Sequence, residues 1–358
     1  MRYALIGCGR ISPNHIMAAK NNHLDIVAVC DIVKENALDK ILKFDLDANK
    51  VKVYEDYRDM LEKEKPELVA IATESGKHAD IALKCIAAGC HVIIEKPIAL
   101  SIADADAIIQ AGKEKGVLVC ANHQNRFNKS IQEIRKAIEK NRFGKLLYGT
   151  AHIRWARNHE YYDRASWRGT WEQDGGALMN QCIHDIDLLR WMMGDEIDMV
   201  YGMTDRLMHP YIEAEDLGLA IVKFKNGSYG TIEGTTNVYP KNLEETLYIF
   251  GEKGTVKAGG EAVNIIEEWK FSDYFGDEED VKKECSENPP NVYGFGHSKL
   301  YKNVINAIEG KEDLVVDGEA GKRALEIVLA IYKSAAEGKP VKLPLKECST
   351  MDFIDRFK

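Results

Sequence analysis

The sequence predicts an α/β protein with two domains: an N-terminal doubly wound parallel sheet, and a C-terminal α+β domain with an open, mostly antiparallel sheet. Three observations lead to this fold class. A short apolar strand near the N-terminus runs into a glycine-rich loop, and apolar strands then alternate with helical stretches up to residue 121. Extended segments with a hairpin signal dominate the second half. The length favours two domains, which we place at residues 1–122 and 123–358.

The first strand and its loop carry a dinucleotide-binding pattern. The strand Arg2–Ile6 leads into Gly7–Ser12, which reads GxGxxG with Ser in the last place. The first glycine of such a loop permits a tight turn, and the second lets a pyrophosphate approach the backbone. The following helix points its N-terminal N–H groups at the phosphates. This predicts a Rossmann domain, with loop contacts from Gly7, Gly9, Arg10 and Ile11.

An acidic residue follows the second strand. Asp25–Cys30 is apolar after its first residue and ends at Asp31, 19 residues after Ser12. This is the place where an acid holds the adenosine ribose hydroxyls. Because a carboxylate repels a 2′-phosphate, the sequence favours NAD over NADP.

Strands and helices continue to alternate after this acid. Apolar runs recur at Leu68–Ala72, His91–Ile94 and Val117–Ala121, with helical stretches near Lys77–Ala88 and Ala103–Lys115 between them. Strands spaced in this way form a parallel sheet with right-handed crossovers.

Polar loops follow these three strands, and ligands of such sheets bind outside the carboxyl ends of the strands. The loops are Thr73-Glu74-Ser75, Glu95-Lys96-Pro97 and Asn122-His123-Gln124. We therefore expect them along the cofactor cleft. The predicted cofactor contacts from this region are Thr73, Ser75, His78, Glu95, Lys96 and Gln124.

The second half is a different kind of chain. Val222–Lys225 and Ser228–Ile232 flank Asn226-Gly227, a hairpin signal. Acid-rich Gly276–Asn288 is typical of a surface loop. We expect the antiparallel sheet to pack against a second subunit, giving a homodimer or homotetramer. The other predicted strands are Leu146–Trp155, Met199–Leu207, Leu217–Phe224, Tyr229–Asn237 and Thr246–Phe250, and the predicted helices are Ile131–Lys140, Asn303–Ile308 and Ala320–Ala336.

Composition narrows the class of protein. The formal charge of −9 argues against a nucleic-acid partner. The sequence contains no run of 18 apolar residues, so we expect no membrane span. Because the N-terminus enters the first strand without room for a signal peptide, we expect a cytoplasmic protein. The eight scattered cysteines lack a CxxC pair and indicate free, buried thiols. No cluster has metal-ligand spacing, so we predict no metal.

Gly175–Met193 predicts a half-buried helix with a proton-exchanging residue. Its apolar residues form one stripe, and Asn180 and His184 lie one turn apart at the edge of that stripe. A histidine beside a polar partner can exchange a proton near neutral pH. A structural histidine is the alternative interpretation of this helix taken alone.

Arginine and aromatic residues are interleaved between Arg154 and Arg168. One interpretation is a packed surface loop with cation–π contacts. The other is a pocket for an anionic, planar-headed ligand such as a nucleotide sugar, because the arginine fork binds phosphate and carboxylate. The residues proposed to bind substrate or cofactor here are Arg154, Arg157, Tyr161, Trp167 and Arg168, with Arg126 joining them from the earlier loop.

The motifs together resemble the glucose-fructose oxidoreductase / inositol dehydrogenase (Gfo/Idh/MocA) family. The glycine loop, Asp31, the Glu95-Lys96-Pro97 loop and the Gly175-Gly176…His184…Asp187 helix occur in the order typical of that family. Asn122–Asn128, Trp167–Trp171 and Gly176–Gln181 look closest to the branch of UDP-N-acetylglucosaminuronate 3-dehydrogenases of surface-polysaccharide synthesis. That resemblance implies NAD-dependent oxidation at C3 of UDP-2-acetamido-2-deoxy-D-glucuronate. Many relatives carry Asp where this chain has Asn180, and Asn cannot ionise.

Oxidation of a secondary alcohol needs a proton acceptor at oxygen while a hydride leaves carbon for the nicotinamide. Lys96 and His184 are the candidates, and either could be the base. We favour Lys96 as the hydrogen-bonding polariser and His184 as the base, with Asn180 orienting His184 or a sugar hydroxyl. A dehydrogenase of a free sugar or inositol, and a non-catalytic NAD-binding regulator, are the alternative functions.

Overall fold

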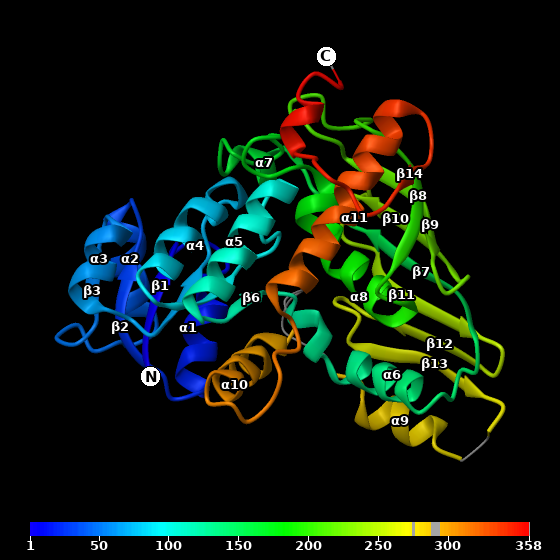
Figure 1. Cartoon of the computed structure of the whole chain (residues 1–358), viewed down its shortest axis with the longest axis horizontal. Helices are drawn as coiled ribbons and strands as arrows, with labels where there is room; N and C mark the ends of the chain where they lie inside the picture. Colours follow the sequence, from blue (N-terminus) through cyan, green and yellow to red (C-terminus); the bar gives the residue numbers. More distant parts are fainter. Residues whose placement is uncertain (274–275, 288–293, 358) are drawn as a thin grey trace. The chain divides into compact units, whose positions relative to one another are not determined.

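The computed structural model describes residues 1–273, 276–287 and 294–357, and Figure 1 traces the chain. The chain divides into two compact units. The first comprises Met1–His123 and His297–Lys322, and the second comprises Gln124–Gly296 and the residues from Arg323 onward. The chain therefore returns to the first unit late in the sequence. The predicted domain boundary at residue 122 does not include this return.

A six-stranded parallel sheet forms the first unit, in the order β3-β2-β1-β4-β5-β6. This is the predicted doubly wound sheet. Its strands are β1 (Arg2–Ile6), β2 (Asp25–Cys30), β3 (Lys52–Tyr54), β4 (Leu68–Ile71), β5 (His91–Ile94) and β6 (Val119–Ala121). The helices of this unit are α1 (Ser12–Asn21), α2 (Lys34–Lys43), α3 (Tyr57–Glu64), α4 (His78–Ala87), α5 (Ile102–Lys115) and α10 (Gly296–Ile308).

The strand order places the polar loops of this unit at one edge. Strands β1, β4 and β5 are almost wholly buried, as expected for a parallel sheet covered on both faces. The order reverses between β1 and β4, and the loops that follow the strands leave from the same edge of the sheet. This edge is where ligands of doubly wound sheets bind.

An eight-stranded, mostly antiparallel sheet forms the second unit, in the order β13-β12-β11-β7-β10-β9-β8-β14. Its strands are β7 (Leu146–Arg154), β8 (Ile197–Asp205), β9 (Leu217–Phe224), β10 (Tyr229–Thr235), β11 (Glu244–Gly251), β12 (Gly254–Gly259), β13 (Ile265–Phe271) and β14 (Val341–Lys342). Its helices are α6 (Lys129–Glu139), α7 (His159–Asp163), α8 (Ile183–Met193), α9 (Glu278–Glu284) and α11 (Gly318–Glu337, shared with the first unit).

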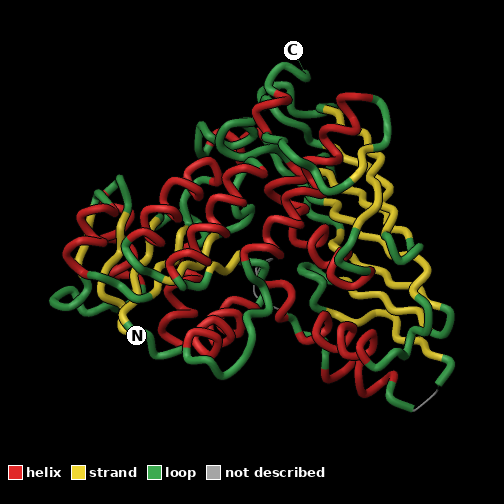
Figure 2. The backbone as a smooth tube through the Cα atoms, viewed as in Figure 1, coloured by secondary structure: helices red, strands yellow, loops and turns green. Residues whose placement is uncertain are grey.

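Helix α8 covers one face of this sheet. A side chain at Gly149 of β7 would meet Leu189 and Met193 of α8 at 2.9 Å, so the absence of a side chain lets the helix approach closely. Ser334 of α11 accepts a hydrogen bond from the Gly202 N–H of β8 at 3.0 Å. In Figure 2 the strands lie along one side of the unit and these helices on the other.

The predicted hairpin is present, since β9 and β10 pair in antiparallel register around Asn226-Gly227. The pairing of β10 with β7 is parallel. Part of the predicted loop Gly276–Asn288 forms helix α9, which has no buried residue, while Asn288 lies outside the described residues. Strands β3, β12, β13 and β14 were not predicted.

None of the eight cysteines forms a disulfide, and all except Cys285 are buried, which confirms the predicted buried thiols. Within the described part of the chain, no helix has the length and apolar character needed to cross a membrane.

Candidate active site

The glycine loop lies directly against the neighbouring strand. Gly7 has φ +92°, and a Cβ there would lie 2.5 Å from the carbonyl oxygen of Ala72. Only glycine permits this turn. Gly9 and Arg10 are exposed, with open space around the Cα of Gly9. The Ser12 hydroxyl donates to the Gly9 carbonyl at 2.6 Å. The loop therefore offers accessible backbone at the start of α1, as pyrophosphate binding requires.

Asp31 follows β2 with its carboxylate held in place. It accepts hydrogen bonds from the Cys8 and Val33 N–H groups, each at 2.8 Å. The residue is half-buried. A fixed carboxylate at this strand end fits the ribose hydroxyls of NAD.

Two residues predicted to contact the cofactor are instead buried. The His78 ring lies between the Pro97 and Thr73 carbonyl oxygens, at 2.7 Å and 3.1 Å. The Glu95 carboxylate binds His15 at 2.9 Å. These partners occupy the side-chain polar atoms of both residues, so the two side chains support their loops, and their contact with the cofactor stays a prediction.

The other predicted residues of these loops are differently exposed. Thr73 and Lys96 are half-buried, whereas Ser75 is buried. Ile11 is half-buried at the start of α1. Gln124 belongs to the second unit, where its amide nitrogen lies 3.4 Å from Nε2 of His184.

Asn180 and His184 stand out on their helix. From Asp174 to Arg190 they are the half-buried residues, and every other residue of that range is buried. The predicted regular helix begins as a π-helical segment, Leu178–Cys182, before α8. Such segments are frequent at functional sites. The Asn180 amide donates to Asp174, which also accepts the Gly169 N–H at 2.7 Å.

The start of this segment depends on a residue that the sequence did not single out. Glu215 accepts the Leu178 N–H at 2.7 Å and the Tyr332 hydroxyl at 3.0 Å. Burial raises the pKa of Glu215 well above its ordinary value. Gly176 lies so close that a Cβ would come within 1.7 Å of the Glu215 carboxylate. The glycine pair before the helix was the only local signal of this contact.

Two of the predicted arginines enclose one tyrosine ring. The guanidiniums of Arg157 and Arg168 lie 4.9 Å and 4.4 Å from the centre of the Tyr161 ring. The Tyr161 hydroxyl accepts from Arg168 at 2.6 Å and from Gln181 at 3.0 Å. The cation–π contacts of the packed-loop interpretation are therefore present. Gln181 joins this cluster to the segment that carries Asn180.

Trp167 belongs to the same cluster, since the Arg168 guanidinium lies 4.5 Å from its ring centre. Neither Arg157 nor Arg168 forms an ion pair with a carboxylate of the described residues. Arg157 instead donates to the Ala156 carbonyl at 2.7 Å and to Asn242 at 3.1 Å.

Arg154 lies on the other face of the sheet from α8. Along β7, Ala151 and Ile153 are buried on the side of the helix, so Arg154 points away from it. Its guanidinium pairs with Glu233 at 2.6 Å and with Glu244. Arg154 therefore cannot reach a substrate bound on the face of the sheet that carries α8 and His184, and the prediction that it binds substrate there is wrong. The alternation of apolar and polar residues along this strand already indicated that Arg154 points away from the helix.

Arg126 is also committed to a structural pair. Its guanidinium binds the Asp187 carboxylate through two hydrogen bonds of 2.6 Å and lies 4.7 Å from the centre of the Trp191 ring. Its side chain is 3% exposed. This burial corrects the prediction that Arg126 binds substrate.

A pair of buried carboxyl groups lies beneath the same helix. Burial raises the pKa of both Asp185 of α8 and Glu245 of β11, that of Asp185 to about 7, and the two carboxyl groups interact electrostatically. Asn125 donates to Glu245 at 3.2 Å. This pair adjoins His184 in sequence and was not predicted.

Comparison with known proteins agrees with this geometry. The family model for the oxidoreductase family, NAD-binding Rossmann fold, matches residues 1–123, and the model for its C-terminal alpha/beta domain matches residues 135–343.

Among solved structures, the chain is similar to the WlbA dehydrogenase from Bordetella pertussis in complex with NADH and UDP-GlcNAcA. The two are 40% identical, with 97% of this chain and 98% of that chain covered and a TM-score of 0.90. The WlbA dehydrogenase from Chromobacterium violaceum, in complex with the same two molecules, is 36% identical over 97% and 96%, with a TM-score of 0.88. Myo-inositol 2-dehydrogenase of Thermotoga maritima is 26% identical over 355 residues, covering 96% of this chain and 98% of the relative.

The glycine loop, the fixed Asp31 and the match of the Rossmann model show an NAD-binding domain, as predicted. With both domains matched in order, this chain belongs to the Gfo/Idh/MocA family of oxidoreductases.

Proposed function

We propose that the protein oxidises the C3 hydroxyl of UDP-linked N-acetylglucosaminuronic acid to the 3-keto sugar with NAD, in the synthesis of nucleotide sugars for surface polysaccharides. The observation that carries this proposal is the state of Arg157 and Arg168. Both are half-buried, both lie on the Tyr161 ring, and neither forms an ion pair with a carboxylate of the described residues. Such guanidiniums suit a ligand with phosphate or carboxylate groups.

The two similar WlbA structures, crystallised with NADH and UDP-GlcNAcA, support the same substrate. An inositol ring has no anionic group for these two guanidiniums to bind. The inositol alternative is favoured by a different observation, the similarity to myo-inositol 2-dehydrogenase. Both substrates therefore belong in the test.

The proposed roles of the side chains follow from their chemistry. NAD, when bound, accepts a hydride from the carbon that carries the reacting hydroxyl. Lys96 donates a hydrogen bond to that hydroxyl, and His184 accepts its proton. Asn180, fixed by Asp174, orients a sugar hydroxyl. Lys96→Ala and His184→Ala should each lower turnover by about 10²–10⁴-fold while NAD affinity, measured by calorimetry, stays close to that of the wild type. Near-native turnover in either variant would remove that residue from the mechanism.

The substrate is tested by following NADH formation with UDP-N-acetylglucosaminuronate, UDP-N-acetylglucosamine, free glucuronate and myo-inositol. The proposal predicts the highest kcat/KM for the UDP-uronate. A higher value for myo-inositol or for free glucuronate would establish the alternative function.

We also propose that the open face of the eight-stranded sheet pairs with a second copy of this chain. Exposed apolar side chains project from its neighbouring strands, Met203 with 66% and Ile221 with 51% of its surface exposed, together with Tyr148, Leu219 and Tyr229. A monomer rarely leaves such a patch in water. Light scattering should give the mass of a dimer or tetramer, and Ile221→Lys should lower that mass; a monomeric wild type would contradict this proposal.

A further inference from the structure

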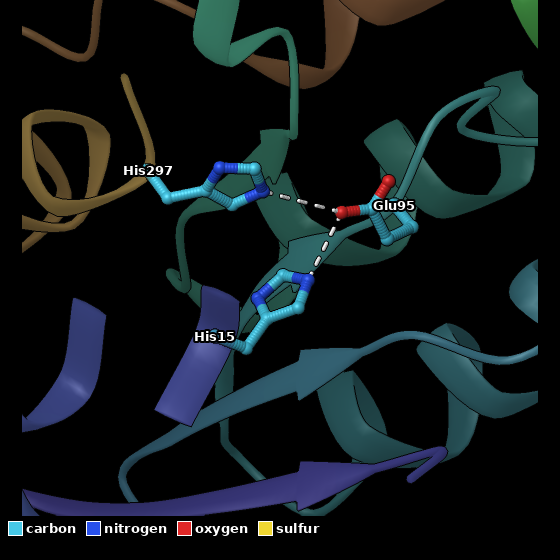
Figure 3. Close-up of side chains that lie close together, drawn as sticks. All are labelled: His15, Glu95 and His297. Atoms are coloured by element: carbon cyan, nitrogen blue, oxygen red, sulfur yellow. Dashed lines mark hydrogen bonds and ion pairs between the residues drawn. The ribbon is translucent and has the colours of Figure 1, made fainter. Parts of the chain in front are cut away.

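A buried hydrogen-bond network within the first unit converges on Glu95, the residue before Lys96. His15 of α1 and His297 of α10 both point toward its carboxylate (Figure 3), with Nε2 atoms 2.9 Å and 3.9 Å from Oε1. The Asn122 amide donates to the same oxygen. The other oxygen, Oε2, accepts the N–H of Lys96 at 3.2 Å. Residues from segments far apart in the sequence therefore surround the Glu95 carboxylate.

The network extends from His15 through two buried tyrosines. The Tyr3 and Tyr301 hydroxyls lie 2.9 Å apart, and the Tyr301 hydroxyl lies 2.7 Å from Nδ1 of His15. Both tyrosines and His15 are fully buried. In one direction of donation, every polar hydrogen of this hydrogen-bond network has an acceptor. Tyr3 donates to Tyr301, Tyr301 donates to Nδ1 of His15, and Nε2–H of His15 donates to Glu95.

The opposite direction is unfavourable. A doubly protonated His15 would donate from Nδ1 to Tyr301, which would then donate to Tyr3. The Tyr3 hydroxyl hydrogen would be left without an acceptor among the described residues, at the cost of a buried unsatisfied donor. The favoured order of donation therefore places a hydrogen on Nε2 of His15, facing Glu95. Burial by itself would raise the pKa of Glu95, but the hydrogen bond from His15 and the nearby His297 ring hold that pKa well below its ordinary value.

The backbone of Lys96 is held on both sides by this arrangement. On one side its N–H binds the Glu95 carboxylate, and on the other the Pro97 carbonyl binds the buried His78 ring at 2.7 Å. A backbone fixed in this way fixes the point and direction from which the Lys96 side chain leaves the loop.

We propose that Glu95 is a positioning residue for Lys96, and that the hydrogen-bond chain Tyr3–Tyr301–His15 keeps its carboxylate charged and immobile. This inference rests on the role proposed for Lys96. The ligand atoms of His15, Glu95 and His297 also lie within 4.8 Å of one another, a spacing that a metal ion could bridge. The direct hydrogen bond of 2.9 Å and the complete donor chain account for the cluster without one.

The kinetic test compares Glu95→Gln with Tyr301→Phe, which removes the donor to His15 and the acceptor of Tyr3. Tyr54→Phe is the matched control, since it removes a hydroxyl of the same unit that binds Glu64 instead. Glu95→Gln should lower kcat by about 10²-fold, the scale of a misplaced catalytic group, with KM and NAD affinity close to wild type. Tyr301→Phe should lower kcat by less, and Tyr54→Phe should leave it unchanged. Unchanged kcat in folded Glu95→Gln and Tyr301→Phe would overturn the proposal.

The second arm needs no substrate. Nitrogen NMR of histidine-labelled wild type, with the His15 signals assigned by a His15→Gln variant, should show neutral His15 protonated at Nε2. A doubly protonated ring, or one protonated at Nδ1, would overturn the donor chain. Zinc added to chelator-treated protein should change neither these signals nor turnover, and a zinc-dependent change would replace the network by a metal site. If UDP-N-acetylglucosaminuronate is not oxidised, the proposed function fails, whereas the NMR arm still decides the network and the kinetic arm moves to the substrate that yields NADH.

Discussion

Gly176→Ala should destabilise the protein and inactivate it for a reason visible in the structure. Gly176 has φ +93°, and an added Cβ would lie 1.7 Å from an oxygen of Glu215. That carboxylate caps the π-helical segment through the Leu178 N–H. The matched control is Gly227→Ala in the β9–β10 turn, where φ is +89° and a Cβ would meet nothing within 4 Å.

The two variants separate backbone strain from the clash. A left-handed alanine costs about 1–2 kcal/mol, and this is the expected loss in free energy of unfolding for Gly227→Ala. Gly176→Ala carries the same strain plus overpacking, which brings the expected loss to about 2–5 kcal/mol. Urea unfolding measures both values, and turnover should fall only in Gly176→Ala because Asn180 and His184 follow the displaced segment. Equal losses in the two variants would refute the packing of Glu215 against this turn.

Three further predictions concern the cofactor, the substrate and pH. Asp31→Ala should narrow the difference between the dissociation constants for NAD and NADP, whereas equal affinities in the wild type would remove the role of the carboxylate. Arg168→Gln should weaken UDP-uronate binding in calorimetry by about ten- to a hundredfold, while Arg154→Gln on the other sheet face should not; equal effects would contradict the assignment. Because burial raises the pKa of Asp185 to about 7, the pair with Glu245 stabilises the fold at acid pH, and this contribution is lost as the pH rises toward 7. Asp185→Asn should therefore flatten the fall in unfolding free energy between about pH 4 and 7, and an unchanged slope would count against the raised pKa of Asp185.

Local sequence patterns predicted the parts of this molecule that depend on local physics. The GxGxxG loop, Asp31 and the Asn226-Gly227 hairpin each need particular residues at short spacing, and the structure has each of them in its predicted place. Asn180 and His184 are also the half-buried residues of an otherwise buried segment, in line with their predicted place at the edge of the apolar stripe.

The remaining features depend on contacts between distant segments. Glu215 reaches the π-helical segment from 37 residues away, and Tyr301 reaches His15 from 286 residues away. No periodicity within either segment specifies such a partner. Arg126 was misassigned for the same reason, because its partner Asp187 lies 61 residues further along the chain. The charge count of a loop does not reveal which arginines are already neutralised.

The most direct measurement of the central claim follows the hydride itself. UDP-N-acetylglucosaminuronate deuterated at C3 is incubated with the protein and NAD, and the mass of the NADH formed is measured by mass spectrometry. The account predicts NADH that carries deuterium from C3, and unlabelled NADH from substrate deuterated at C4. Deuterium transfer from another carbon, or no NADH from this substrate while myo-inositol yields it, would contradict the proposed reaction.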